Sequence, residues 1–373
     1  MRTKRTNRFM ALLLAASVLL CQVFVTTALA APEDAAADFV VEDGVLTQYL
    51  GRGGEVTLPN AVREIGSGVF RGNRDLIRVT FGPDVVKIGD NAFRDSGLTG
   101  SITFPAGLQT IGSAAFYGCS RLISTLAIPT QVQSIGNDAF RGCSGLTGLG
   151  LSEGLLTIGN NAFRDCTGFR NDLIIPNTVT SVGSAAFYNC SGFDGQLQLS
   201  ASMTVINDST FYGCSNVTGE VVIPDKVTRI NDSYAFREMQ KITAIRFGTA
   251  LTTIGTYYTF YNDTAVTTLT FTSAAPPAGA TGILGQFAAL RTIYVPEAAY
   301  AAYVSAFSGS LAVGVRLLPA GGGGADFLVE DGVLYYYSGE GGEITIPNGV
   351  TEIAANAFRN NRSVTAVHFP AGL

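Results

Sequence analysis

The stretch AAFYGCSRLISTLAIPT, residues 114–130, returns as DAFRGCSGLTGLGLSEG at residues 138–154 and as NAFRDCTGFRNDLIIPN at residues 161–177. Each copy has an Ala-Phe pair, a Cys three residues after the Phe, and then a short run of alternating apolar residues. Self-similarity at a fixed period is the sequence signature of repeat architectures, in which one unit cannot bury its own apolar face. These copies therefore decide the fold class of the whole chain.

A Phe marks the same place in every repeat, and successive Phe residues are 23 to 25 positions apart. We predict that these residues form the structural core: Phe70, Phe93, Phe116, Phe140, Phe163, Phe187, Phe211, Phe236 and Phe260. An Ile or Val usually lies five residues before the Phe, and another apolar residue usually lies six residues after it. Stacked units can cover these side chains whereas single units cannot, so the pattern predicts a repeat solenoid with one shared interior.

The alternating runs assign the two faces of a short strand in each repeat, because successive side chains of a strand point to opposite sides. In LAI, Leu126 and Ile128 are expected to point inward and Ala127 outward. The outward positions, expected on the concave face, are Thr57, Thr80, Thr103, Ala127, Gly150, Ile174, Gln198, Val222, Arg246, Thr270 and Tyr294. This column is small, polar and varied, which fits a solvated surface and leaves a contact surface for protein or glycan open.

The recurring frame IGxxAFxxCxxLxxLxIPxxV resembles the BspA-type leucine-rich repeat of bacterial surface proteins. The resemblance extends over nearly all of the chain after its first 30 residues. It implies a β-rich, right-handed leucine-rich-repeat superhelix that is capped at its ends. It also implies a secreted or cell-surface protein that adheres to host proteins or to other cells.

The ends of the array and the segments outside it are also predicted from the sequence. Residues 1–30, with a basic start, an apolar run and small residues at the end, are typical of a secretory signal peptide, and 31–37 form a short leader. The first array with its caps takes 38–318, beginning with a hairpin around EDG and ending with a capping helix at 297–307. A Gly-rich linker at 319–325 precedes a second array, 326–373, which stops in mid-repeat and indicates that the chain is truncated.

Composition and charge exclude some classes of partner. The chain has 24 Lys and Arg against 29 Asp and Glu, and four of the basic residues lie in the predicted signal peptide. The remainder therefore has a net charge of 20 minus 29, or −9. An acidic chain without a basic cluster is not expected to bind nucleic acid. No second apolar stretch approaches the ~20 residues of a membrane span, so no membrane insertion is expected in the residues given.

Five cysteines follow the anchor Phe at the same offset and should form one column along the solenoid: Cys119, Cys143, Cys166, Cys190 and Cys214. Neighbouring rungs are about 4.8 Å apart, which is within the range for a disulfide between rungs. The alternative is that each thiol is a small buried side chain, and the odd count argues against complete pairing. No Cys or His pair has the spacing of a zinc site, so we expect neither a metal nor another cofactor.

No arrangement of catalytic residues is apparent, and we predict that the protein is not an enzyme. His368 is the single histidine and lies in the second array, so residues 31–367 offer no Ser-His-Asp or Cys-His combination. Most acidic residues lie in turns such as GDNAF, where Asp and Asn suit the turn geometry. A pair of carboxylates for acid–base catalysis is not excluded by number, but the turn role is favoured.

The position directly after each anchor Phe is occupied by Arg or Tyr only. We call this set the ladder: Arg71, Arg94, Tyr117, Arg141, Arg164, Tyr188, Tyr212, Arg237 and Tyr261. Stacked at the spacing of the rungs, these side chains could form a self-stacking cover over the Phe layer through cation–π contacts. Alternatively they form a rigid stripe for a partner, because Tyr and Arg are common anchors of interfaces.

Three functions follow from these features. The favoured one is a secreted or cell-surface, non-catalytic recognition protein that binds a protein or glycan ligand on a host or neighbouring cell. The second is a targeting module of a larger exported enzyme whose catalytic domain lies beyond Leu373. The third is an inert surface spacer. The spacing alone indicates a scaffold, and a fold does not specify its partner.

Overall fold

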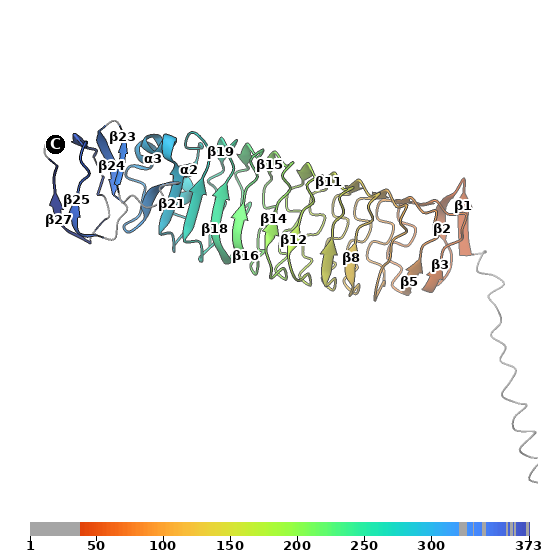
Figure 1. Cartoon of the computed structure of the whole chain (residues 1–373). Helices are drawn as coiled ribbons and strands as arrows, with labels where there is room; N and C mark the ends of the chain where they lie inside the picture. The colour runs from red at the N-terminus through yellow and green to blue at the C-terminus, as the bar shows by residue number, and fades with distance from the viewer. Residues whose placement is uncertain are drawn as a thin grey trace, which may run out of the picture.

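The computed structural model describes residues 38–320, 327–330, 332–337, 341–355, 357–358, 361, 363–370 and 373. The predicted signal peptide, 1–30, and leader, 31–37, lie outside the described residues. The chain winds into an elongated rod in which each turn of the coil lies beside the next, from β1 at one end to β27 at the other (Figure 1). The predicted solenoid is confirmed.

Most turns of the coil contribute two short strands to two separate sides of the rod. On one side an eight-stranded sheet has the order β1-β2-β4-β6-β7-β9-β11-β13 and is followed by the sheet β15-β17-β19. The strands of these two sheets are β1 (Phe39–Glu42), β2 (Val45–Tyr49), β4 (Glu64–Ile65), β6 (Lys87–Ile88), β7 (Thr110–Ile111), β9 (Ser134–Ile135), β11 (Thr157–Ile158), β13 (Ser181–Val182), β15 (Val205–Ile206), β17 (Arg229–Ile230) and β19 (Thr253–Ile254).

The other side carries the strands that the alternating apolar runs predict. They pair as β3-β5, β8-β10, β12-β14 and β16-β18-β20-β21-β22. Their bounds are β3 (Gly54–Thr57), β5 (Leu76–Thr80), β8 (Thr125–Ala127), β10 (Gly148–Gly150), β12 (Leu173–Ile174), β14 (Leu197–Gln198), β16 (Thr218–Val222), β18 (Lys241–Phe247), β20 (Thr268–Phe271), β21 (Thr292–Pro296) and β22 (Arg316–Ala320). We call this side the strand face.

Outside the antiparallel hairpins that begin the two arrays, the described strands pair in parallel and in register with the repeat. Ile111 pairs with Ile135, and Leu126 pairs with Leu149. Because equivalent residues of consecutive repeats lie side by side, each kind of side chain forms a column along the rod. The columns that the sequence predicts are therefore real neighbours in space.

The anchor Phe residues form a continuous stack through the interior. From Phe70 to Phe260, consecutive rings have centroids 5.0 to 5.8 Å apart and planes within 2° to 16° of parallel. All nine are buried, with at most 1% of their surface exposed. Tyr49 and Phe287 extend the stack at its two ends, with centroids 4.9 Å and 5.4 Å from the neighbouring Phe.

Two residues in each turn around the anchor Phe have a left-handed backbone, one two residues before it and one two residues after it. The earlier slot holds Gly68, Asn91, Ala114, Asp138, Asn161, Ala185, Ser209, Tyr234 and Tyr258, all with φ between 52° and 69°. Gly, Asn and Asp adopt this conformation at low cost, whereas other L-residues do so at a cost of about 1–2 kcal/mol. In GDNAF, Asn91 therefore serves the turn, whereas the Asp90 carboxylate accepts a hydrogen bond of 2.7 Å from the Ser113 backbone N–H of the next rung.

The N-terminal cap is the predicted hairpin. β1 and β2 pair antiparallel, and their turn residues Asp43 and Gly44 both have positive φ, which is the geometry of a tight hairpin turn. β2 then pairs in parallel with β4, so the hairpin covers the first rung.

The C-terminal end has the predicted helix and two features that the sequence reading missed. The helix is present as the 3₁₀ turn Glu297–Ala299 followed by α3 (Tyr300–Phe307). A second short helix, α2 (Ala280–Leu284), follows the loosened repeat. After α3 the chain returns as β22, whose Pro319 and Ala320 pair with β21. These two residues belong to the array, so the predicted linker begins later than 319; its residues 321–325 lie outside the described residues.

The second array repeats the start of the first. β23 (Phe327–Glu330) and β24 (Val333–Tyr337) form an antiparallel hairpin, and β24 pairs with β26 (Glu352–Ile353). β25 (Gly342–Thr345) pairs with β27 (Val364–His368). The buried cluster of Leu334, Ile346, Val350 and Ala357 is separate from the core of the first array.

Candidate recognition surfaces

The ladder residues lie in one row, and the structure brings most of them into contact. The Arg94 guanidinium lies 4.4 Å from the Tyr117 ring centroid, and that of Arg141 lies 5.5 Å from the same ring. A second group runs from Arg164 through Tyr188, Tyr212 and Arg237 to Tyr261, with distances of 4.2 to 5.5 Å between consecutive members. Arg71 is exposed at the N-terminal end of the row.

Four ladder arginines are also paired with acidic residues from the left-handed slots around the anchor Phe. Arg141 lies 3.2 Å from Asp138, and Arg237 lies 3.3 Å from Glu238. Arg94 and Arg164 pair in the same way with Asp95 and Asp165, at 3.3 Å and 3.5 Å. These pairs are partly exposed, so each adds little to stability. Their geometry fits the self-stacking interpretation of the ladder, and a partner would contact its outer edge.

The outward column of the strand face is held by two sheets in its C-terminal half, β12-β14 and β16-β18-β20-β21-β22. Ile174 pairs with Gln198, and Val222 pairs with Arg246, which is followed by Thr270 and Tyr294. Ile174 and Val222 are 51% and 45% exposed, which places apolar side chains between polar ones on this surface. A mixed surface of this kind is better suited to contact with a partner than a uniformly polar one.

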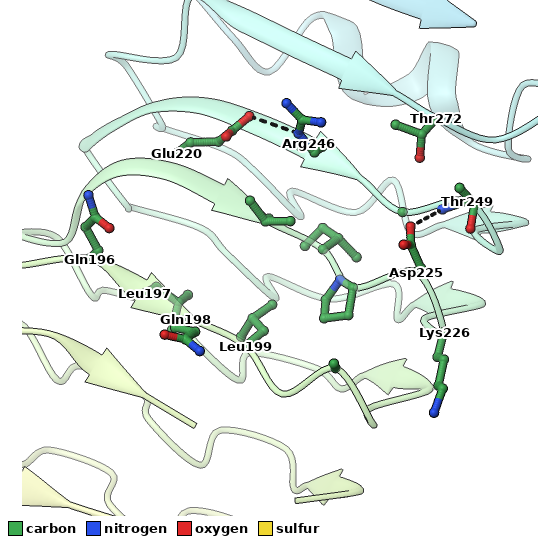
Figure 2. Close-up of a pocket in the computed structure, with 15 residues that line it drawn as sticks. Gln196, Leu197, Gln198, Leu199, Glu220, Asp225, Lys226, Arg246, Thr249 and Thr272 are labelled. Carbon is green, nitrogen blue, oxygen red and sulfur yellow. Dashed lines mark hydrogen bonds and ion pairs between the residues drawn. The ribbon is translucent and has the colours of Figure 1, made fainter. Parts of the chain in front are cut away.

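The strand face is hollowed where β14, β16 and β18 meet. The hollow has a volume of about 870 Å³. Figure 2 shows Gln196 and Gln198 on one side of it and the Glu220–Arg246 pair on the other, with Asp225 and Thr249 at the far end. Arg246 lies 3.6 Å from Glu220, and the Asp225 carboxylate accepts a hydrogen bond of 3.0 Å from the Thr249 backbone N–H. We call this hollow the strand-face groove.

The five cysteines are buried free thiols, not disulfides. Each donates a hydrogen bond of 3.0 to 3.3 Å to the backbone carbonyl of the anchor Phe in the preceding rung. Burial raises the pKa of the Cys119 thiol to about 11 and that of Cys214 to about 12. Because the thiolate is the nucleophile, these residues are unreactive. The column serves the packing and hydrogen bonding of the interior.

The column of the cysteines continues along the chain to Asp263, a buried residue that the sequence analysis missed. The slots after Cys214 hold Met239 and Asp263, and Asp263 is fully buried. Its Oδ1 accepts a hydrogen bond of 2.8 Å from the Met239 backbone N–H, whereas its Oδ2 has no partner. Burial is the main cause that raises the pKa of this carboxyl well above its usual value. Burial therefore favours the neutral form of the Asp263 carboxyl inside the solenoid.

Within the described ranges, no three His, Cys, Asp or Glu side chains gather in a way that could hold a metal ion. No helix in the part of the chain that the structure describes is long and apolar enough to cross a bilayer. The single His368 lies on the surface of the second array, 3.8 Å from Glu343.

The family of the chain follows from the repeat and from its coil. A model of the BspA-type leucine-rich-repeat region matches residues 53–170, 123–232, 170–281, 193–312 and 332–373. These ranges cover more than half of the chain, so it belongs to the BspA-type leucine-rich-repeat family. No curated protein matches it.

Several solved structures are similar. A leucine-rich cell surface protein of Faecalibacterium prausnitzii is 21% identical over 89% of this chain and 92% of its own, with a TM-score of 0.41. A leucine-rich-repeat protein of Bacteroides ovatus is 20% identical over 90% and 89%, with a TM-score of 0.41. The pneumococcal vaccine antigen PcpA is 16% identical over 71% and 79%, with a TM-score of 0.38.

Proposed function

We propose that this protein is an exported, cell-surface recognition protein that binds a partner protein without catalysis. Membership of the BspA-type family and the solenoid fold support a binding role, because repeat solenoids present extended surfaces to their partners. The single observation that carries the proposal is the strand-face groove, in which exposed apolar and polar side chains converge.

The groove suits an extended segment of a partner protein. Its volume of about 870 Å³ lies in the range of ligand sites. Val222 offers an apolar contact, while Gln198 and Arg246 offer side-chain amide and guanidinium groups for peptide carbonyls. Gln and Arg side chains that line an open hollow keep hydrogen-bonding capacity for a ligand.

The ladder is the second candidate surface in this proposal. Its rings and guanidinium groups are held in place by each other and by their acidic neighbours, so little freedom is lost when a partner binds. The targeting module and the spacer remain alternative functions. The length of the reading frame tests the first of them, because a hydrolase domain encoded in the same frame would favour targeting.

A binding screen tests the proposal directly. The chain from residue 31 is immobilised and exposed to a panel of purified extracellular-matrix proteins, and binding is measured by surface plasmon resonance. We expect at least one partner, and we expect the V222A/R246A double variant to bind it at least tenfold more weakly.

The matched control is the T57A/T80A variant, which changes the same column near the N-terminal cap, away from the groove. It should bind as the unchanged chain does. If no protein of the panel binds, the spacer function is favoured. An equal loss of affinity in both double variants would exclude the groove as the contact surface.

A further inference from the structure

A group of tyrosines interrupts the regular ladder near the C-terminal end of the first array. It consists of Tyr212, Tyr234, Tyr257, Tyr258 and Tyr261 around the Arg237 guanidinium, and we call it the tyrosine cluster. The guanidinium carbon lies 5.1 to 5.7 Å from the ring centroids of Tyr212, Tyr234, Tyr258 and Tyr261. Consecutive rings of the cluster lie 5.0 to 6.2 Å apart.

The cluster has a backbone cost that the fold does not require. Tyr234 and Tyr258 occupy the left-handed slot before the anchor Phe with φ of 57° and 53°, where earlier rungs have Gly, Asn, Asp, Ala or Ser. A bulky residue is unfavourable there. Burial offsets little of this cost at Tyr258, which is 43% exposed, whereas Tyr234 is half-buried. Strained backbone at exposed side chains is typical of functional sites.

The charge inside the cluster is already neutralised. Arg237 lies 3.3 Å from Glu238, and the same carboxylate accepts a hydrogen bond of 3.2 Å from the Tyr212 hydroxyl. Arg237 already contacts four of the five rings, and its guanidinium disfavours a second cation beside them. Asp232, which accepts backbone hydrogen bonds from Thr256 and Tyr257, disfavours an anionic ligand beside the rings.

What the cluster presents to solvent is therefore a set of neutral, rigid phenol rings with hydroxyl groups. The exposed Thr256 and Asp232 beside it are polar, so no wide apolar surface surrounds the rings as the core of a standard protein interface requires. A pyranose sugar has the complementary chemistry, with a flat C–H face that packs on an aromatic ring and hydroxyl groups that form hydrogen bonds. We propose that the tyrosine cluster is a binding site for a neutral oligosaccharide.

The test uses the chain from residue 31 and three neutral hexasaccharides as probes: cellohexaose, maltohexaose and N-acetylchitohexaose. Binding is measured by isothermal titration calorimetry and by intrinsic tyrosine fluorescence, which is readable because the chain has 14 Tyr and no Trp. We expect at least one of the three to bind. We expect the Y257A/Y258N variant to bind it at least tenfold more weakly, a change of about 1.4 kcal/mol.

The variants separate binding from folding. Asn fills the slot of Tyr258 in earlier rungs, so Y258N should leave the thermal midpoint unchanged or raise it while it weakens binding. Y117R, a ladder change outside the cluster, should bind as the unchanged chain does. V222A/R246A in the strand-face groove should also bind sugar normally, which keeps this result independent of the proposed protein contact.

Three results would overturn the inference. They are the absence of binding to all three hexasaccharides at millimolar concentration, equal affinity in Y257A/Y258N, and capture of a protein through these tyrosines while the sugars do not bind. The last result would assign the cluster to a protein partner.

Discussion

The rungs around Phe140 and those around Phe260 have the same backbone but use their equivalent slots differently. Around Phe140 the left-handed slot holds Asp138 and the buried slot holds Cys143, whose thiol donates to a backbone carbonyl. Around Phe260 the same slots hold Tyr258 and Asp263, which has an unpartnered oxygen. In the regular rung both slots hold residues that suit their surroundings, whereas Tyr258 and Asp263 in the later rung each lower the stability of the fold.

The largest effect is expected from removing one ring of the Phe stack. Phe140 is fully buried and has a parallel ring on each side, at 5.2 Å and 5.5 Å. Replacing it by Ala should lower the free energy of unfolding by about 3–5 kcal/mol, because burial is lost and a cavity remains. Urea unfolding followed by circular dichroism measures this loss. I174A, which truncates an exposed residue, is the control, and an equally large loss there would contradict the shared interior.

Asp263 gives the next effect, and its size depends on pH. The pKa of its carboxyl is raised in the folded state, so between the unfolded pKa, about 3.9, and the folded pKa the native chain binds more protons than the unfolded chain. Stability then falls as pH rises through this window, by up to about 1.4 kcal/mol per pH unit. The D263N variant keeps a side-chain oxygen that accepts the hydrogen bond from the Met239 backbone N–H. It has no titrating carboxyl at this position, so it does not lose stability in this way as pH rises.

Urea unfolding at pH 4, 5, 6 and 7 should therefore show D263N and the unchanged chain converging at pH 4, with D263N the more stable above it until the folded pKa is reached. D84N, a change at an exposed carboxylate, controls for the altered net charge. A difference between D263N and the unchanged chain that stays constant with pH would contradict the neutral acid.

A reciprocal exchange between the two regions should have a smaller effect. N161Y places a bulky residue in the left-handed slot of a regular rung and should lower stability by about 1–2 kcal/mol. Y258N makes the opposite change in the later rung and should raise stability by about 1 kcal/mol, since Asn tolerates this conformation. Thermal melts of both variants measure the exchange. If both changes lower stability equally, the tyrosines are structural and the comparison fails.

The sequence specifies the coil better than it specifies the surfaces. The solenoid and the Phe core follow from a strict apolar period, because one register must bury all these columns at once. The two caps follow from local hairpin and helix-start signals. Helix α2 and strand β22 were missed because the period fades after Phe260 and only tertiary pairing places them. Asp263 and Tyr258 were missed for another reason, because each departs from what its slot usually holds. Asp263 lies in the column of the cysteines, and Tyr258 lies in a left-handed slot where the rungs before Tyr234 have Gly, Asn, Asp, Ala or Ser.

The smallest effect should come from the ladder. Arg141 has one ring, that of Tyr117, and one partly exposed acid, Asp138, beside it. R141Q should therefore cost less than about 1 kcal/mol. Arg237 contacts four rings, so R237Q should cost more than R141Q, and the difference should persist in high salt, which screens exposed ion pairs. Urea unfolding in low and high salt measures both variants. Equal losses would show that the tyrosine cluster is no more tightly organised than the rest of the ladder, which would remove one support for its role as a preformed site.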